Sequence, residues 1–133
     1  MNNYIKITIT LAAIIAFAAC QKKDLSPVDL NKVTVQYNTA INGKTFHKGD
    51  TITVDADIAY TSELNGVMLQ IADSATDEIL YLDDQDLHTD HFNLQRKWID
   101  TCSTAATLKI IIKVAVANGT EFAENKIQFN VQP

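Results

Sequence analysis

Apolar and polar residues alternate with a period of two along most of the chain from residue 32 onward. This period is typical of strands that bury one face, and no stretch sustains the 3.6-residue period of a helix. The alternation predicts about seven strands, at residues 33–38, 51–60, 67–72, 79–82, 92–98, 108–117 and 126–131. The run 108–117 is the most apolar, so we expect it at the centre of a sheet. Ile111 lies on its outward parity, and we therefore expect the outer face of this strand to be partly covered as well.

Turn dipeptides separate several of these strands. Asn42-Gly43, Asn65-Gly66 and Asn118-Gly119 each combine two residues that tolerate positive φ. Asn118-Gly119 lies between the last two predicted strands and is the clearest hairpin, whereas Gly49-Asp50 precedes the second strand. Short strands with frequent turns over about 100 residues predict an all-β fold, an antiparallel sandwich.

The segment from Gly43 to Ile52 has the sequence GKTFHKGDTI and resembles the start of many bacterial immunoglobulin-like modules. The resemblance extends over residues 32–133 and implies an antiparallel immunoglobulin-like β-sandwich of about seven strands. The cysteine pair of antibody domains is absent, because Cys102 is the one cysteine in this segment. Trp98 is also outside the position expected for the central tryptophan of antibody domains.

The first residues have the features of an export signal. Residues 7–19 form an uncharged apolar run, which is shorter than the roughly 20 residues that a membrane-spanning helix needs. The run ends in Phe17-Ala18-Ala19-Cys20, which resembles the lipobox of bacterial lipoproteins. The resemblance implies a signal peptide at residues 1–19 and a diacylglycerol group on the Cys20 thiol. The alternative is a buried N-terminal helix with a free cysteine.

A polar segment follows Cys20, and its composition is typical of a tether. Residues 20–31 would hold a domain at residues 32–133 near a membrane, to which two or more acyl chains give durable attachment. The start Cys20-Gln21-Lys22-Lys23-Asp24 resembles lipoproteins of the Bacteroidota. It implies an outer-membrane lipoprotein of the cell envelope, facing either the periplasm or the cell surface.

Composition narrows the functional classes. The 133 residues include 11 basic and 16 acidic side chains, a net charge of −5, whereas nucleic-acid binding needs a basic surface. The sequence contains neither a Gly-x-Ser-x-Gly motif nor a glycine-rich phosphate loop, so we predict no enzyme activity. We expect a binding or accessory module whose partner is an envelope protein or a glycan. Met68, Leu80 and Ile111 are candidates for its exposed apolar patch, and Asp55 and Asp57 are expected on a solvated strand face.

Histidines and acids gather between residues 73 and 91, which suggests a metal site. Residues 73–90 contain seven acids and no lysine or arginine. Imidazole with carboxylate suits Zn²⁺ or Cu²⁺, and carboxylates with carbonyl groups suit Ca²⁺. The candidate ligands are His88, His91, Asp86 and Asp90, with His47 as a further one. The alternative is a solvated acidic loop that joins two strands without binding an ion.

Two further residues carry candidate chemistry. Cys102 is an odd thiol in an exported domain, and it is either a partly buried small residue or a site of intermolecular disulfide formation or thiol reactivity. No basic residue lies within two positions of Cys102 to activate it. Asp73-Ser74-Ala75 resembles the three-residue O-glycosylation motif of exported Bacteroidota proteins, and the resemblance implies Ser74 as the acceptor.

Overall fold

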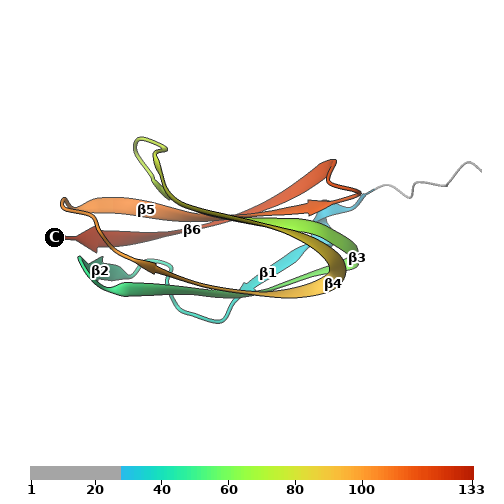
Figure 1. Ribbon diagram of the computed structural model, residues 1–133, viewed down its shortest axis with the longest axis horizontal. Coiled ribbons are helices and arrows are strands. Elements are labelled where there is room, and N and C mark those ends of the chain that lie inside the picture. The colour runs from blue at the N-terminus through green and yellow to red at the C-terminus, as the bar shows by residue number, and fades with distance from the viewer. Residues whose placement is uncertain (1–27) are drawn as a thin grey trace, which may run out of the picture.

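The structure is a computed structural model, and it describes residues 28–133. The predicted signal peptide, Cys20 and most of the predicted tether lie outside the described residues. A short 3-10 helix, η2 (Leu30–Lys32), leads into six strands (Figure 1). They are β1 (Thr34–Tyr37), β2 (Thr45–His47), β3 (Thr51–Asp73), β4 (Ile79–Ile99), β5 (Ala106–Val116) and β6 (Glu121–Gln132). The all-β prediction is confirmed, and residues 28–133 include no helix with the length and hydropathy to cross a bilayer.

All six strands belong to one mixed sheet that curls into a half-barrel. The strand order is β1-β3-β5-β6-β2, and β4 lies off this path, where it pairs with β3. Every pairing is antiparallel except that of β2 with β6. The first half of β3 pairs with β1 and the second half with β5, while β4 follows β3 along both halves. The two layers are therefore parts of one sheet, joined where β3 and β4 bend together at the right of Figure 1.

The predicted sandwich of about seven strands is corrected in its strand count and its connections. Residues 51–60 and 67–72, predicted as two strands, are the two halves of β3. Residues 79–82 and 92–98 likewise both belong to β4. A strand can change layer without ending when it carries extra residues that bend it, and a period-two pattern alone does not show such continuity.

The bend in β3 arises from irregular pairing with its neighbours. The register shifts between Ala59 and Leu64, and again between Leu64 and Gly66. The predicted turn at Asn65-Gly66 is therefore wrong, because both residues lie inside the strand. Gly66 instead allows β3 and β4 to approach each other closely, because a Cβ atom at this position would lie 3.3 Å from the carbonyl oxygen of Gln85.

The other Asn-Gly predictions are confirmed as turns. The connection between β5 and β6 has φ values of 52°, 60° and 78° at Ala117, Asn118 and Gly119, as a tight hairpin requires. Asn42-Gly43 forms a turn just before β2. The alternation did not predict β2, whose three residues lie opposite residues 130–132 of β6.

The core lies between the two layers and is largely aliphatic. The strand β5 lies between β3 and β6, which confirms the central position predicted for residues 108–117. Ile111, on the outer face of β5, is only 8% exposed, as predicted. The largest fully buried side chains are Phe129, Ile52, Ile58, Leu64, Leu69, Ile71, Leu94, Leu108, Ile110 and Ile112.

The strand β4 is an edge strand, because within residues 28–133 it pairs with β3 alone. Residues 83–90, considered above as an acidic loop, are part of this strand. On its inner side, Arg96 donates from Nε to Oδ2 of Asp83 at 2.7 Å and from Nη2 to Oε1 of Gln85 at 3.1 Å. Since Asp83 and Arg96 belong to opposite halves of β4, these contacts join the two layers along the open side of the half-barrel, called the mouth below.

Candidate functional site

An apolar groove lies on the outer face of the sheet, over the second half of β3. It encloses about 320 Å³ and is bounded by residues of β3, β4, β5 and β6 and of the β5–β6 turn. Two rows of residues cross these strands at the groove. The first row is Asp86, Gly66, Ala115 and Phe122, and the second is Asp84, Met68, Lys113 and Glu124. The groove is therefore a product of strand register across four strands.

Small residues at the centre of the first row create the hollow. Gly66 has no side chain and Ala115 has only a methyl group, so in this row the two middle strands carry no large outward side chain. Phe122 is 58% exposed and forms one wall, while Met68 contributes to the floor. An exposed aromatic ring beside small neighbours leaves apolar surface that a ligand side chain can cover.

The two sides of the groove differ in charge. On the β6 side, Nζ of Lys113 lies 3.6 Å from Oε2 of Glu124. Glu124 also pairs with Lys126 at 2.5 Å, and this contact lowers the pKa of the Glu124 carboxyl group. On the β4 side, Asp84 and Asp86 form no ion pair within residues 28–133. The unneutralised acidic side favours a ligand that carries a basic group next to its apolar part.

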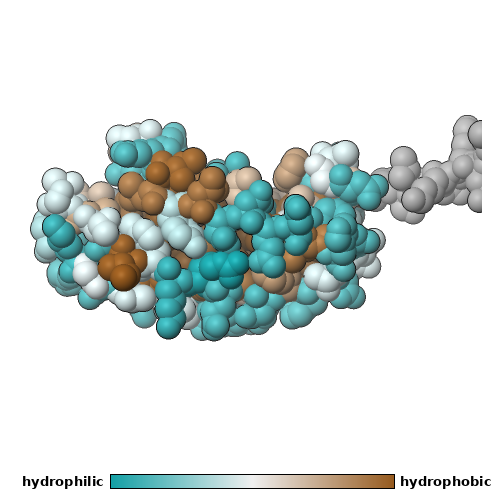
Figure 2. Space-filling view, in the orientation of Figure 1, coloured by the Kyte–Doolittle hydropathy of each residue, from teal (hydrophilic) through white to brown (hydrophobic). Residues whose placement is uncertain are grey.

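Exposed apolar side chains continue from the groove toward the β3–β4 hairpin. Ile79, Leu80 and Leu82, at the start of β4, are all exposed. Figure 2 shows apolar side chains gathered beneath the tip of that hairpin, at the upper left of the view. Of the three residues predicted for an apolar patch, Leu80 is exposed, Met68 is half-buried at the groove floor and Ile111 is buried.

The candidate metal ligands are not brought together. Nδ1 of His88 lies 2.7 Å from Oε1 of Glu63, whereas Nε2 of His91 lies 3.8 Å from Oδ1 of Asp57. His47 lies on β2, and the acidic candidates are exposed on β4: Asp86 and Asp90. Within residues 28–133, no group of three or more His, Cys, Asp or Glu side chains has the spacing to hold a metal ion. The Zn²⁺, Cu²⁺ or Ca²⁺ site stays a prediction without a ligand cluster to support it.

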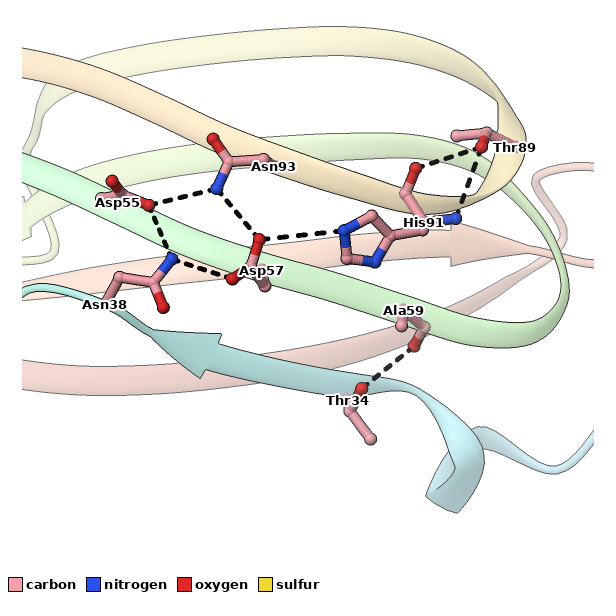
Figure 3. A network of polar contacts seen from close by, with 8 residues as sticks. All are labelled: Thr34, Asn38, Asp55, Asp57, Ala59, Thr89, His91 and Asn93. Atoms are coloured by element: carbon pink, nitrogen blue, oxygen red, sulfur yellow. Dashed lines mark hydrogen bonds and ion pairs between the residues drawn. The ribbon is translucent and has the colours of Figure 1, made fainter.

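The outer face over the first half of β3 is polar. Asp55 and Asp57 point outward there, as predicted, between β1 and β4 (Figure 3). Nδ2 of Asn38 donates to both carboxylates at 2.9 Å, and Nδ2 of Asn93 donates to both at 3.2 and 3.0 Å. These bonds hold the pKa of both carboxyl groups below the usual value, with Asn38 contributing most at Asp55 and Asn93 most at Asp57. Because the sheet itself satisfies these groups, this face offers little to a ligand.

Cys102 is partly buried against the core, in the segment between β4 and β5. Burial and then the adjacent Asp100 raise the pKa of its thiol to about 11, so the thiol stays protonated at neutral pH and is a weak nucleophile. Asp100 is 1% exposed, and its Oδ1 accepts a hydrogen bond from the Cys102 N–H at 2.8 Å. These contacts agree with a structural role for Cys102.

Ser74, the predicted glycosylation acceptor, lies in the turn between β3 and β4. Its backbone N–H donates to the carbonyl oxygen of Thr107 at 2.9 Å. Its Oγ is buried and has no hydrogen-bond partner among the described residues. A glycosyltransferase needs an exposed hydroxyl, so modification of Ser74 requires this turn to open, and it stays a prediction.

No protein-family model and no curated protein matches this chain. A proposal for its function therefore rests on its sequence and on the surface of residues 28–133. Gly66, Ala115 and Phe122 are absent from the candidates that the sequence indicates. Ile127 and Phe129 are expected to face inward, and the same alternation extended back along the strand places Phe122 outward. The sequence pattern could therefore have identified Phe122 as an outward residue. The apposition of Gly66 and Ala115 depends on strand register, which no local pattern encodes.

Proposed function

We propose that this chain is a lipid-anchored binding or accessory module of a bacterial cell envelope, without catalytic activity. The groove formed by Gly66, Ala115 and Phe122 is the observation that supports a binding role. Its apolar interior and acidic β4 side suit a partner that presents an apolar side chain beside a lysine or arginine. A protein surface supplies both groups, whereas a neutral glycan lacks the cation, so we favour an envelope protein as the partner.

The membrane anchor in this proposal rests on the sequence around Cys20. The replacement Cys20→Ala should remove the acylation site and either release the chain from the membrane fraction or block its processing. Cell fractionation with mass spectrometry of the mature chain measures both effects. A Cys20→Ala chain that keeps its membrane association and its normal mature mass would contradict the lipid anchor.

We also infer a relationship of the domain to immunoglobulin-like sandwiches. Its two packed layers of mainly antiparallel strands, with an aliphatic core between them, support this inference. The continuous β3–β4 bend and the parallel β2–β6 pair depart from that plan, and the relationship would therefore be a distant one.

Photocrosslinking in the native envelope tests the groove. A photoreactive phenylalanine analogue at position 122 should give one discrete adduct with an envelope protein. The matched control carries the same analogue at Gln128, which is exposed on the same face of β6 beyond the groove. The additional change Ala115→Gln, which places a longer side chain in the groove, should remove the adduct. Equal adducts at both positions, or an adduct insensitive to Ala115→Gln, would contradict binding in the groove.

A further inference from the structure

The side chains along the long free edge of β4 are arranged so that this strand could pair with β4 of a second copy of the chain. β4 has 21 residues, and within residues 28–133 only β3 pairs with it. The N–H and C=O groups that point away from β3 along this edge have no partner strand, and an edge of this kind is a template for a further strand. The edge is also charged, so any strand that pairs with it has to match its charges.

The alternation of side chains along β4 changes phase at the bend. Even-numbered residues from Leu82 to Asp90 face outward, whereas odd-numbered residues from His91 to Ile99 do so. A second β4 that runs antiparallel, with Asp90 opposite His91 of the other copy, therefore places outward residues opposite outward residues along both halves. The two-fold axis of this arrangement passes through the bend, along the sheet normal. Both copies then curve in the same direction, as a continuous sheet requires.

This register places complementary outer side chains opposite one another. Leu82 lies opposite Ile99 of the second copy, and these side chains are 54% and 58% exposed in the single chain. Asp84 lies opposite Lys97 of the second copy, and neither residue has an ion pair within residues 28–133. The two-fold axis repeats each pair, so the edge would gain two apolar contacts and two ion pairs.

Neighbouring registers lack this complementarity. A slip of two residues in one direction places Leu82 opposite Lys97, and a slip in the other direction places Asp84 opposite Ile99. A slip of one residue turns the outward side chains of one copy toward the core side of the other. The side chains of β4 therefore favour one register over its neighbours.

The inner side of the edge is compatible with the same register. Arg96 already donates to Gln85 and Asp83 of its own chain across the mouth. In the paired edge Arg96 would lie opposite Gln85 of the second copy, and Leu87 opposite Leu94. The polar groups of the mouth would thus meet polar groups, and the buried leucines would meet leucines.

We propose that β4 pairs antiparallel with β4 of a second copy of this chain, with Asp90 opposite His91, to form a two-fold symmetric dimer. The paired edge shares Asp84 with the acidic side of the groove, whereas Ala115 on β5 and Phe122 on β6 lie two and three strands away from that edge. Ala115→Gln should therefore leave the dimer intact.

Disulfide trapping of the full chain in the envelope tests the register. Asp84 and Lys97 lie on the outer faces of opposite layers, so Asp84→Cys with Lys97→Cys can form a disulfide only between chains. The matched control, Leu82→Cys with Gln95→Cys, is exposed in the same way but is four residues out of register. We expect at least about fivefold more disulfide dimer from the first variant on a non-reducing gel, because a disulfide needs Cβ atoms within about 4.5 Å.

Three outcomes would overturn the proposal. They are equal trapping by the two variants, no trapped dimer, and a ladder of higher species, since a two-fold interface closes at two chains. A disulfide to a different protein would assign the edge to that partner instead.

Charge reversal supplies an independent measurement. Asp84→Lys should weaken the dimer about tenfold, because it replaces two attractive contacts by two repulsive ones. The combined change Asp84→Lys with Lys97→Asp should restore dimerisation to near the original level. Analytical ultracentrifugation of the detergent-extracted chain measures both. Failure of the combined change to restore what the single change removed would contradict the pairing of Asp84 with Lys97.

Discussion

The two halves of β3 have similar aliphatic inner faces, but their outer faces differ in chemical character. Both halves bury aliphatic side chains with no exposed surface, such as Ile58 and Leu69. On the outside, the first half carries Asp55 and Asp57, whose carboxylates accept hydrogen bonds from the amide groups of Asn38, just after β1, and of Asn93 on β4. The second half carries the groove over Gly66, where apolar surface and acidic groups are left without partners. The buried inner residues of both halves stabilise the fold. Of the two outer faces, only that of the second half presents groups without partners that a ligand could bind.

The largest expected effect tests whether the inner faces are equivalent. Ile58→Ala and Leu69→Ala each remove a fully buried side chain, one from each half of β3. Each should lower the free energy of unfolding by about 2–5 kcal/mol, through lost burial and the cavity left behind. Urea unfolding followed by circular dichroism measures both. If one variant lost little stability, the two layers would not share a common core.

The next effect tests the polar link between the halves. Arg96 and Asp83 are about one-third exposed, so their coupling in a double-mutant cycle with alanine should be about 1 kcal/mol. The control Lys44→Ala, at an exposed position outside the mouth, should change stability by less than about 0.5 kcal/mol. Additive effects of Arg96→Ala and Asp83→Ala would mean that the contact does not hold the layers together.

The polar outer face should give an acid-dependent effect. The lowered pKa values of Asp55 and Asp57 mean that each ionised group favours the folded state. Such stabilisation is complete above the unfolded pKa, near 4, and is lost as the pH falls through the lower folded pKa. The combined change Asn38→Ala and Asn93→Ala should therefore shrink the stability difference between pH 7 and pH 3. Unfolding curves at the two pH values measure it, and an unchanged difference would show that the amides do not set these pKa values.

The smallest expected effect distinguishes recognition from stability within one strand. Phe122→Ser removes a side chain that is 58% exposed and should change the free energy of unfolding by no more than about 0.5 kcal/mol. Phe129→Ser removes a buried ring of the same strand and should cost at least about 3 kcal/mol. Urea unfolding of the two variants gives the comparison. A large loss at Phe122 would identify the groove wall as part of the structural core.

The period-two pattern predicted which residues face inward along β1, β3, β5, β6 and the second half of β4, because burial selects apolar side chains on alternate positions. It identified β5 as central and the hairpin at Asn118-Gly119. It could not predict that β3 continues through Asn65-Gly66, because that dipeptide usually marks a turn and only the pairing with β4 and β5 holds it extended. The acidic residues 83–90 resembled a loop for a similar reason: their place in the sheet comes from distant partners.

The candidate site was less accessible to sequence reasoning than the fold. Met68, Leu80 and Ile111 were candidates for an apolar patch if they face outward; Met68 lines the groove and Leu80 is exposed at the start of β4, whereas Ile111 is buried. The hollow itself requires Gly66 opposite Ala115 and Ala115 opposite Phe122. Ala115 and Phe122 flank the Asn118-Gly119 turn, but Gly66 is far from both in sequence, and its place opposite Ala115 depends on a register that only the assembled sheet specifies.

The parallel pairing of β2 with β6 also has a consequence for the order of folding. Residues 45–47 find their partners only at residues 130–132, at the far end of the chain. A contact between segments so distant closes a large loop and forms late, after the neighbouring hairpins are in place. Although β2 is the second strand to be synthesised, it can pair only after the last residues of the chain are available. Removal of the last four residues would leave β2 without its partner in β6.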